Sequence, residues 1–191
     1  MLLASFVLFF SCTDDAVSYV DPVAYVNPMI GTCSSPDTDL FGNECIVPHS
    51  NASCVPGACT PYGMTHICPV TIYKGCNPPG YNVHDSTMIG FPFMRFSGSG
   101  WSGEFGNLLT MPTVGPLQTC YGSYDGTFPG YRQPFDKTTE TARPGYYSAR
   151  LINSNILTEC TTTHHCGILR FTFPESELSR IQSDLAFRLT G

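Results

Sequence analysis

The sequence predicts an all-β domain, an antiparallel β-sandwich, on three observations. Its 18 glycines and 16 prolines are spread along all 191 residues, so long helices would be interrupted. Only 13% of the residues are charged while 42% are hydrophobic, which argues against disorder and against a coiled coil. The C-terminal third reads as successive strands separated by turn residues, without helical patterns between them.

The chain opens with MLLASFVLFFSC, an apolar block of signal-peptide length that is too short to span a bilayer as a helix. We expect residues 1–18 to be a secretory signal and residues 19–191 to form the domain, in a secreted or extracellular protein. Cys12 follows Phe9-Phe10-Ser11, which weakly matches a bacterial lipidation box, so a lipid-anchored surface form is an alternative.

Residues 17–31, VSYVDPVAYVNPMIG, alternate apolar and polar positions between prolines and predict an opening strand near a sheet edge. A cysteine-rich insert follows at about 33–76. It holds six of the ten cysteines among Pro, Ser, Asn and Thr, which predicts loops stapled by disulfides of undetermined pairing in an oxidising compartment. Asn51-Ala52-Ser53 is a glycosylation sequon in the same insert.

The rest of the chain predicts a loop region and then short strands. Residues 80–106 form the glycine- and serine-rich loop region, and residues 108–111 a short strand leaving it. Residues 120–140 are expected to be a turn-rich link. Three successive strands follow, at 145–152, 156–173 and 180–189.

Composition and spacing exclude several functions. The net charge is −6 and no basic run exists, so nucleic-acid binding has no electrostatic support. Cys160, His164, His165 and Cys166 could be read as a zinc site, but no Cys-x-x-Cys pair exists, and a Cys160–Cys166 disulfide across a hairpin is the preferred interpretation. We expect no metal site in this chain.

Trp101 is the only tryptophan, and it lies among closely spaced glycines, serines and Glu104. A flat apolar face ringed by hydrogen-bonding groups suits a sugar ring, although composition alone favours a core position for a tryptophan. His84 and Asp85 are adjacent and point in different directions on an extended chain. A glycosidase needs two carboxylates flanking the bond, and the spacing brings no two together, so surface positions are the better expectation. The carboxylates weighed are Asp85, Glu104, Glu140 and Glu159.

Several motifs occur in one order along almost the whole chain after the signal. They are PVAYVNPMIGT, CVPGACTPYGM, GYNVHDSTMIGF, SGSGWSGEFGNLLTMPTVG, RPGYYSARL, RFTFPESE and SDLAFRL. Together they resemble the N-terminal domain of glycoside hydrolase family 92, the calcium-dependent exo-acting α-mannosidases. The resemblance implies a β-sandwich that precedes an (α/α)₆-barrel and is here incomplete, lacking its last strands and the barrel.

The resemblance further implies inverting hydrolysis of mannose-terminated glycans, with the acid, the base and the calcium ligands in the absent barrel. This chain would hold no cofactor and no catalytic residue, and alone it would be inactive. Its partners would be mannose-containing glycans and its own barrel, without a membrane span. The loop matching SGSGWSGEFGN would lend side chains to the mannose pocket, with Trp101 as one wall. His84, Asp85 and Glu104 share the matched region and are further candidates for sugar contact.

Two departures from the family pattern limit the transfer. Histidines usual in a Phe-Ser-His-x-His-x-Ser-Gly stretch are replaced here by residues 91–98, FPFMRFSG, and the glycine-rich segment after the first motif is replaced by cysteine-rich sequence. Two other functions stay open. One is a stand-alone secreted carbohydrate-binding module, and the other is a disulfide-rich surface protein without a sugar site.

Overall fold

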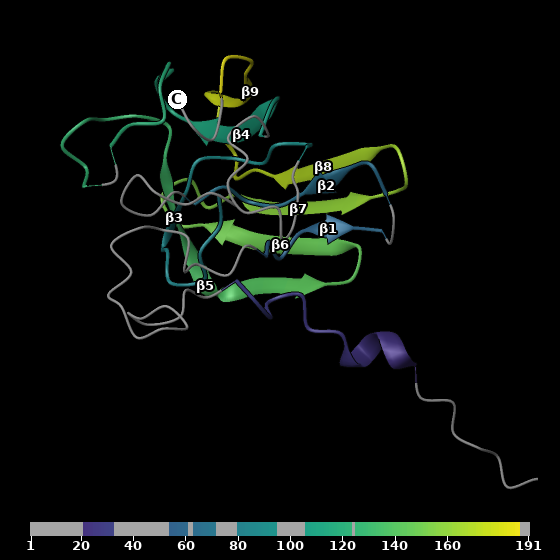
Figure 1. Ribbon diagram of the computed structural model, residues 1–191. Helices are drawn as coiled ribbons and strands as arrows, with labels where there is room; N and C mark the ends of the chain where they lie inside the picture. Colours follow the sequence, from purple (N-terminus) through teal and green to yellow (C-terminus); the bar gives the residue numbers. More distant parts are fainter. Residues whose placement is uncertain are drawn as a thin grey trace, which may run out of the picture.

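The structure, a computed structural model, describes residues 21–32, 54–60, 63–71, 80–94, 106–123 and 125–187 (Figure 1). In this part of the chain one short 3-10 helix, η1, precedes nine strands, and all strand pairs are antiparallel. The elements are η1 Pro22–Tyr25, β1 Ala58–Cys59, β2 His66–Ile67, β3 Thr87–Met88, β4 Leu109–Val114, β5 Gln133–Arg143, β6 Tyr146–Leu151, β7 Leu157–Thr162, β8 Gly167–Thr172 and β9 Ser179–Asp184.

The main sheet has five strands in the order β3-β5-β6-β7-β8. Its strands alternate between two faces, as the two-residue period of a strand requires. On β6, Tyr147, Ala149 and Leu151 enter the core, and Tyr146 and Arg150 lie on the other face. The sheet therefore has one apolar face and one mixed face.

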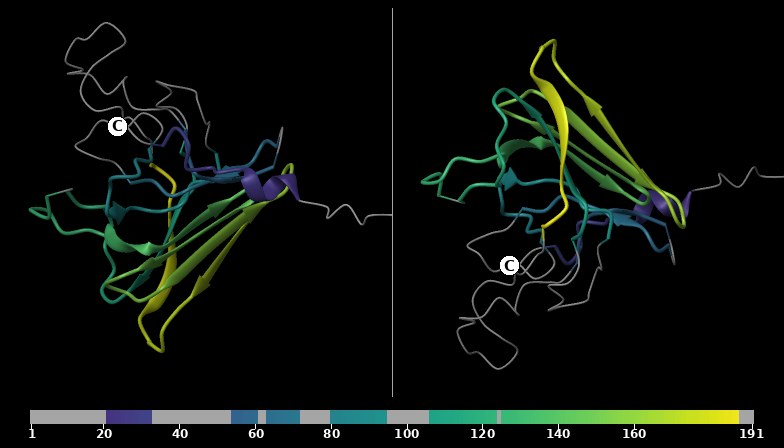
Figure 2. Two further views of the ribbon diagram at one scale, coloured as in Figure 1. Left: turned by 90° about the horizontal axis from the view of Figure 1, so that it is seen from below. Right: turned by 90° about the horizontal axis from the view of Figure 1, so that it is seen from above.

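Shorter elements cover the apolar face. The β1–β2 pair packs against β6 and β7, and Figure 2 shows the blue and teal segments along one side of the green strands. β4 and β9 form a separate two-stranded sheet with an unbroken register from Leu109↔Asp184 to Val114↔Ser179. The core lies between these layers and contains Ile67, Met88, Ile89, Phe91, Leu109, Met111, Phe135, Tyr147, Leu151 and Ile156.

Residues 87–91 connect the two layers. Thr87 and Met88 pair with β5 of the main sheet, and three residues later Phe91 bridges to Thr110 of β4. Gly90 stands at this corner with φ 145° and bridges to Val70. A Cβ on Gly90 would meet the Thr110 carbonyl oxygen at 2.9 Å, so the position excludes a side chain.

The structure confirms the antiparallel all-β class and the predicted strand at 108–111, which is part of β4. Three expectations about elements are wrong. The proline-punctuated segment expected to be an opening strand forms η1 and turns in its described residues, because Asp21 accepts the Val23 amide and caps the helix. The expected link at 120–140 contains the start of the long strand β5, and the expected strand at 156–173 is the β7–β8 hairpin.

The predicted Cys160–Cys166 disulfide is also wrong, because both thiols are free. Cys160 pairs across the hairpin with Leu169 and points into the core, where its thiol lies 3.8 Å from the Ile67 carbonyl oxygen. Cys166 lies in the exposed turn. In the predicted insert, Cys54 and Cys59 are free thiols as well. The signal, Asn51 and the rest of the insert lie outside the described residues.

Candidate functional site

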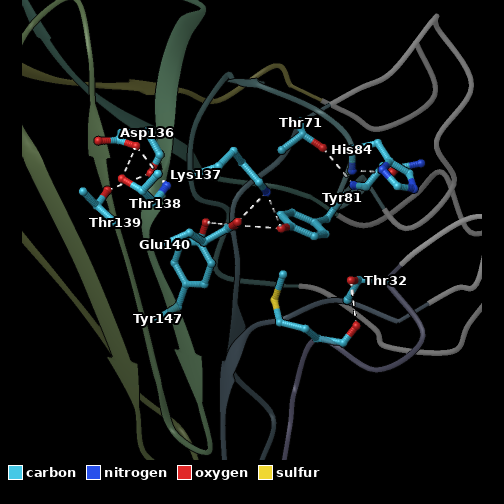
Figure 3. A network of polar contacts seen from close by, with 12 residues as sticks. Thr32, Thr71, Tyr81, His84, Asp136, Lys137, Thr138, Thr139, Glu140 and Tyr147 are labelled. Atoms are coloured by element: carbon cyan, nitrogen blue, oxygen red, sulfur yellow. Dashed lines mark hydrogen bonds and ion pairs between the residues drawn. The ribbon is translucent and has the colours of Figure 1, made fainter.

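A buried polar cluster joins the GYNVHD segment to the main sheet (Figure 3). The Glu140 side chain is 5% exposed, and its Oε1 accepts hydrogen bonds from Tyr81 at 2.7 Å and Tyr147 at 2.6 Å. The Lys137 ammonium pairs with the other carboxylate oxygen and donates to the Tyr81 hydroxyl at 3.2 Å. The charge of Glu140 is therefore compensated by one cation and two hydroxyl donors, as a buried carboxylate requires.

An irregularity in β5 brings Glu140 to the inner face. The register of β5 against β6 shifts between Asp136 and Thr141. The Asp136 carboxylate accepts from the Thr138 amide at 2.9 Å and from its hydroxyl at 2.7 Å. The Thr139 hydroxyl donates to the Asp136 carbonyl at 2.7 Å and receives the Arg150 amide at 3.0 Å. These bonds satisfy backbone groups that a regular ladder would have paired.

Both tyrosines of the cluster are held in the neutral form. Burial raises the pKa of Tyr81 well above its usual range, and the neighbouring Glu140 charge raises it further. Tyr147 is fully buried, and the same two causes raise its pKa in the same order. The hydroxyls therefore act as hydrogen-bond donors to Glu140.

Asp85 lies fully buried next to this cluster. Its two carboxylate oxygens accept no hydrogen bond with acceptable geometry. Burial raises the pKa of Asp85 to about 6, and the Thr71 hydroxyl and the charges of Arg132 and Lys137 offset only part of that effect. Asp85 is thus a carboxyl group that titrates close to neutral pH.

The structure describes two of the four predicted sugar contacts, His84 and Asp85, and it places their side chains in different environments. Asp85 is buried, whereas the adjacent His84 is exposed, with its amide donating to the Asn82 side chain at 2.9 Å. The two side chains thus diverge, as expected of neighbours on an extended segment. Trp101 and Glu104 lie outside the described residues, so their role in sugar contact stays a prediction.

The expectation that the carboxylates are surface groups is wrong for the three that the structure describes. Asp85 and the Glu140 side chain are buried, and Glu159 is only 8% exposed. Glu159 lies on the other face of the sheet, where it accepts the Arg170 guanidinium through two 2.6 Å bonds and the Tyr146 hydroxyl at 2.8 Å. The Arg170 hydrogen bonds lower the pKa of Glu159. The sequence holds a signal for both buried glutamates, namely a nearby cation. Lys137 lies three residues before Glu140 in β5, and Arg170 lies opposite Glu159 in the β7–β8 hairpin.

Asp85, Glu140 and Glu159, the described members of the candidate set, do not form a glycosidase pair. Glu140 and Glu159 lie on opposite faces of the main sheet, and Asp85 is enclosed. Within the described ranges, no three His, Cys, Asp or Glu side chains lie close enough to hold a metal ion. In the same ranges, no helix has the length and apolar character needed to cross a membrane.

Comparison with known proteins identifies the family. The family model for the glycosyl hydrolase family 92 N-terminal domain matches residues 25–191. The chain belongs to this family. A family 92 α-mannosidase from Bacteroides thetaiotaomicron in complex with mannoimidazole is similar to this family 92 domain, with a TM-score of 0.75 and 28% identity over 87% of this chain and 20% of that chain.

Two further similar proteins are also glycosidases. A family 92 inverting mannosidase from Bacteroides thetaiotaomicron VPI-5482 has a TM-score of 0.61 and 27% identity over 83% of this chain and 19% of that chain. An uncharacterized secreted glycosidase of Arthroderma benhamiae is 28% identical over 160 residues, 82% of this chain and 18% of the relative. The family 92 domain described here thus spans about a fifth of the length of the proteins it matches.

Proposed function

We propose that this chain is the carbohydrate-binding N-terminal domain of a secreted, inverting α-mannosidase that acts on mannose-terminated glycans. The observation that supports the proposal is the match of residues 25–191 to the family 92 N-terminal domain, together with the structural likeness to a mannosidase in complex with mannoimidazole. The similar secreted glycosidase supports the extracellular location. The general acid, the general base and a calcium ion would belong to a C-terminal barrel outside this chain.

In this proposal the domain contributes walls of the mannose subsite and no reacting group. Trp101 would stack on the C–H face of the terminal mannose, and Glu104 and His84 would hydrogen-bond its hydroxyls. Asp85 is enclosed in the described structure, so we assign it no direct contact with the sugar. The Tyr81–Glu140–Tyr147 cluster fixes the same segment to the main sheet.

The test is mannose release from α-mannosides by the full-length enzyme and its Trp101→Ala variant. Loss of a stacking wall should lower kcat/KM by about 10- to 100-fold, because aromatic contacts of this kind contribute on the order of 1–3 kcal/mol. Phe128→Ala is the matched control, since Phe128 is an aromatic residue that is 71% exposed on another loop. Equal activity of wild type and Trp101→Ala would exclude Trp101 from the subsite.

The 191-residue chain alone separates the proposal from the two alternatives. We expect it to release no mannose and to bind mannosylated glycans weakly on an array. Strong glycan binding that is lost in Trp101→Ala would instead favour a stand-alone binding module. A full-length protein that neither binds nor cleaves mannosides would favour a surface protein without a sugar site.

A further inference from the structure

The turn at residues 82–85 of the GYNVHD segment carries a buried acid between exposed neighbours. The Asp85 amide donates to the Asn82 carbonyl oxygen at 3.0 Å, and the Asn82 side-chain oxygen accepts the His84 amide at 2.9 Å. The Asp85 side chain is fully buried, while His84 and Ser86 on either side of it are exposed. A movement of a few residues would therefore carry the carboxyl group from the interior into water.

Hydrogen bonds to two neighbouring segments hold the turn closed. The Asn82 amide donates to the Thr71 hydroxyl at 2.9 Å, and the Val83 amide donates to the Thr32 carbonyl oxygen at 3.1 Å. The turn belongs to no strand, since β3 begins after it at Thr87. Short segments outside a sheet open locally at a lower free energy than the strands of the core. The turn can thus open while the main sheet stays folded.

The cations near Asp85 are already engaged with other groups. The Lys137 ammonium pairs with Glu140, and the Arg132 guanidinium donates to the Thr87 hydroxyl at 3.2 Å. Neither carboxylate oxygen of Asp85 accepts a hydrogen bond with acceptable geometry. A buried carboxylate without such bonds is disfavoured in its charged form, so ionisation of Asp85 favours a conformation in which water reaches it.

Groups from three segments act on the charge of Asp85. They are the Thr71 hydroxyl, the charges of Arg132 and Lys137 from around the start of β5, the adjacent His84, and Tyr81 of the same segment. Burial has the largest effect and raises the pKa of Asp85 to about 6. In an open turn the carboxyl group has its ordinary pKa of about 4. Opening therefore releases a proton between these two values, and rising pH favours the open turn.

We propose that the turn at residues 82–85 is a pH-dependent switch, closed while Asp85 is protonated and opened to water when Asp85 is ionised. Because His84 lies on this turn, the switch regulates the mannose subsite, and this consequence rests on the function proposed above. Acidic conditions hold His84 in position, and neutral conditions release it. Asp85 is a positioning residue here, since it does not touch the sugar itself.

The test of the switch is hydrogen–deuterium exchange of the full-length protein, followed by mass spectrometry of peptides that contain residues 82–85. After correction for the intrinsic exchange rate, the opening constant should rise about 50-fold between pH 4 and pH 7.5. Asp85→Asn should remove this rise, because the amide does not ionise. Peptides from β6 and β7 should show no such rise in either protein.

Two variants serve as controls for the exchange experiment. His84→Asn removes a neighbouring group that can also titrate near neutral pH, and the rise should persist in this variant. Asp125→Asn changes an exposed aspartate of another turn and should also leave the rise unchanged. Wild-type exchange that does not change with pH, or an equal rise in Asp85→Asn, would overturn the proposal. The wild-type measurement decides even where a variant fails to fold.

The regulation of the subsite is tested by mannoside hydrolysis with the full-length enzyme. The KM of the wild type relative to Asp85→Asn should be about twofold or more higher at pH 7.5 than at pH 5, because an open turn reduces the fraction of binding-competent enzyme. The kcat ratio should stay constant. A KM ratio that is the same at both pH values would separate the switch from the subsite. An enzyme without mannosidase activity would contradict the proposed function alone, since the exchange result does not depend on it.

Discussion

Asp85 and Glu140 are both buried carboxylates, but their surroundings have opposite effects on stability. Glu140 has a cation and two hydroxyl donors, so its charge is stabilised in the folded protein. Asp85 has no hydrogen bond with acceptable geometry, and burial favours its neutral form. One residue therefore supports the fold through its charge, and the other opposes the fold whenever it is charged.

Asp85→Asn should make the stability of the protein less dependent on pH. The folded-state pKa of about 6 lies above the ordinary value, so the folded protein binds more protons between about pH 4 and pH 6. Wild-type stability therefore falls as pH rises through that window and stays low above it. The measured quantity is the free energy of urea unfolding of Asp85→Asn minus that of the wild type. This difference should be about 1–3 kcal/mol more favourable to the variant at pH 7.5 than at pH 4.

Asp125→Asn is the control for this experiment, because the charge of Asp125 should change stability with pH in the opposite direction. Hydrogen bonds from Ser123 and Thr127 lower the pKa of Asp125 to about 2, so its contribution is present at neutral pH and is lost as pH falls through the folded pKa. An Asp85→Asn variant with the same difference from wild type at both pH values would contradict the burial argument.

Substitutions at Glu140 should show a graded loss of stability. Glu140→Leu leaves the Tyr81 and Tyr147 hydroxyls and the Lys137 ammonium without their acceptor and should cost about 3–5 kcal/mol. Glu140→Gln keeps an acceptor oxygen and should cost less. Glu175→Gln, at an exposed position, should change little. The free energies of unfolding check this order, and equal effects of the two Glu140 variants would contradict it.

At the scale of elements, the 87–91 segment decides how the two layers meet. It pairs with β5 at one end and with β4 at the other, and Gly90 provides the turn between them. Strands that pass from one sheet to the next commonly bend at such a position. Gly90 is therefore the residue of this segment at which a side chain is least tolerated.

Gly90→Ala should lower stability by about 2–4 kcal/mol, because it combines an unfavourable φ with contacts of 2.9–3.0 Å to Thr110 and Leu109. Gly115→Ala is the matched control, since Gly115 also has a positive φ, 102°, but an added Cβ meets nothing within 4 Å. It should cost only about 1 kcal/mol. Equal thermal shifts for the two variants would show that backbone conformation, and not contact, sets the effect.

The errors of sequence reasoning at this scale have a common cause. Pro134 and the Asp136–Thr139 stretch read as turn residues, yet they lie within β5. Pro134 pairs with Thr87 of β3, and the Asp136–Thr139 stretch lies at the register shift. In the 17–31 segment, alternation predicted a strand, but the side-chain cap at Asp21 determines the local structure of its described part. Local patterns identify β6 and the beginning of β9 because those strands are regular, but the expected strand at 180–189 runs past the end of β9 at Asp184. Local sequence patterns do not show which stretches with turn-like residues lie within a strand at a register shift.

At the scale of the whole molecule, sequence patterns predicted the class and the family but not the site's interior. The ordered motifs name the GYNVHD segment, and only the fold brings Glu140 beneath Tyr81, 59 positions away along the chain. Hydrogen bonds of that kind depend on the register of separate strands. No pattern in the sequence around either residue indicates the contact.

The segment at 21–32 exposes several large apolar side chains within eight positions, which predicts self-association of the isolated chain. Tyr25 is 77% exposed and Ile30 74% exposed. Large exposed apolar side chains gathered in one short segment can contact another protein surface. Tyr25→Ser combined with Ile30→Ser should increase the monomer fraction in sedimentation experiments, whereas Ile168→Ser, at an exposed position on β8, should do less. A wild-type chain that is already monomeric at high concentration would contradict this.

The β4–β9 pair also has a consequence for the order in which the chain is built. Its paired residues are 65 (Val114 and Ser179) to 75 (Leu109 and Asp184) positions apart along the chain, so β4 leaves the ribosome long before its partner exists. Until β9 arrives, β4 presents a free edge that other strands could pair with. Closing so large a loop is entropically slow. The vulnerable species during biosynthesis is therefore a chain arrested between β8 and β9, and a chaperone that shields β4 would raise the yield of the folded protein.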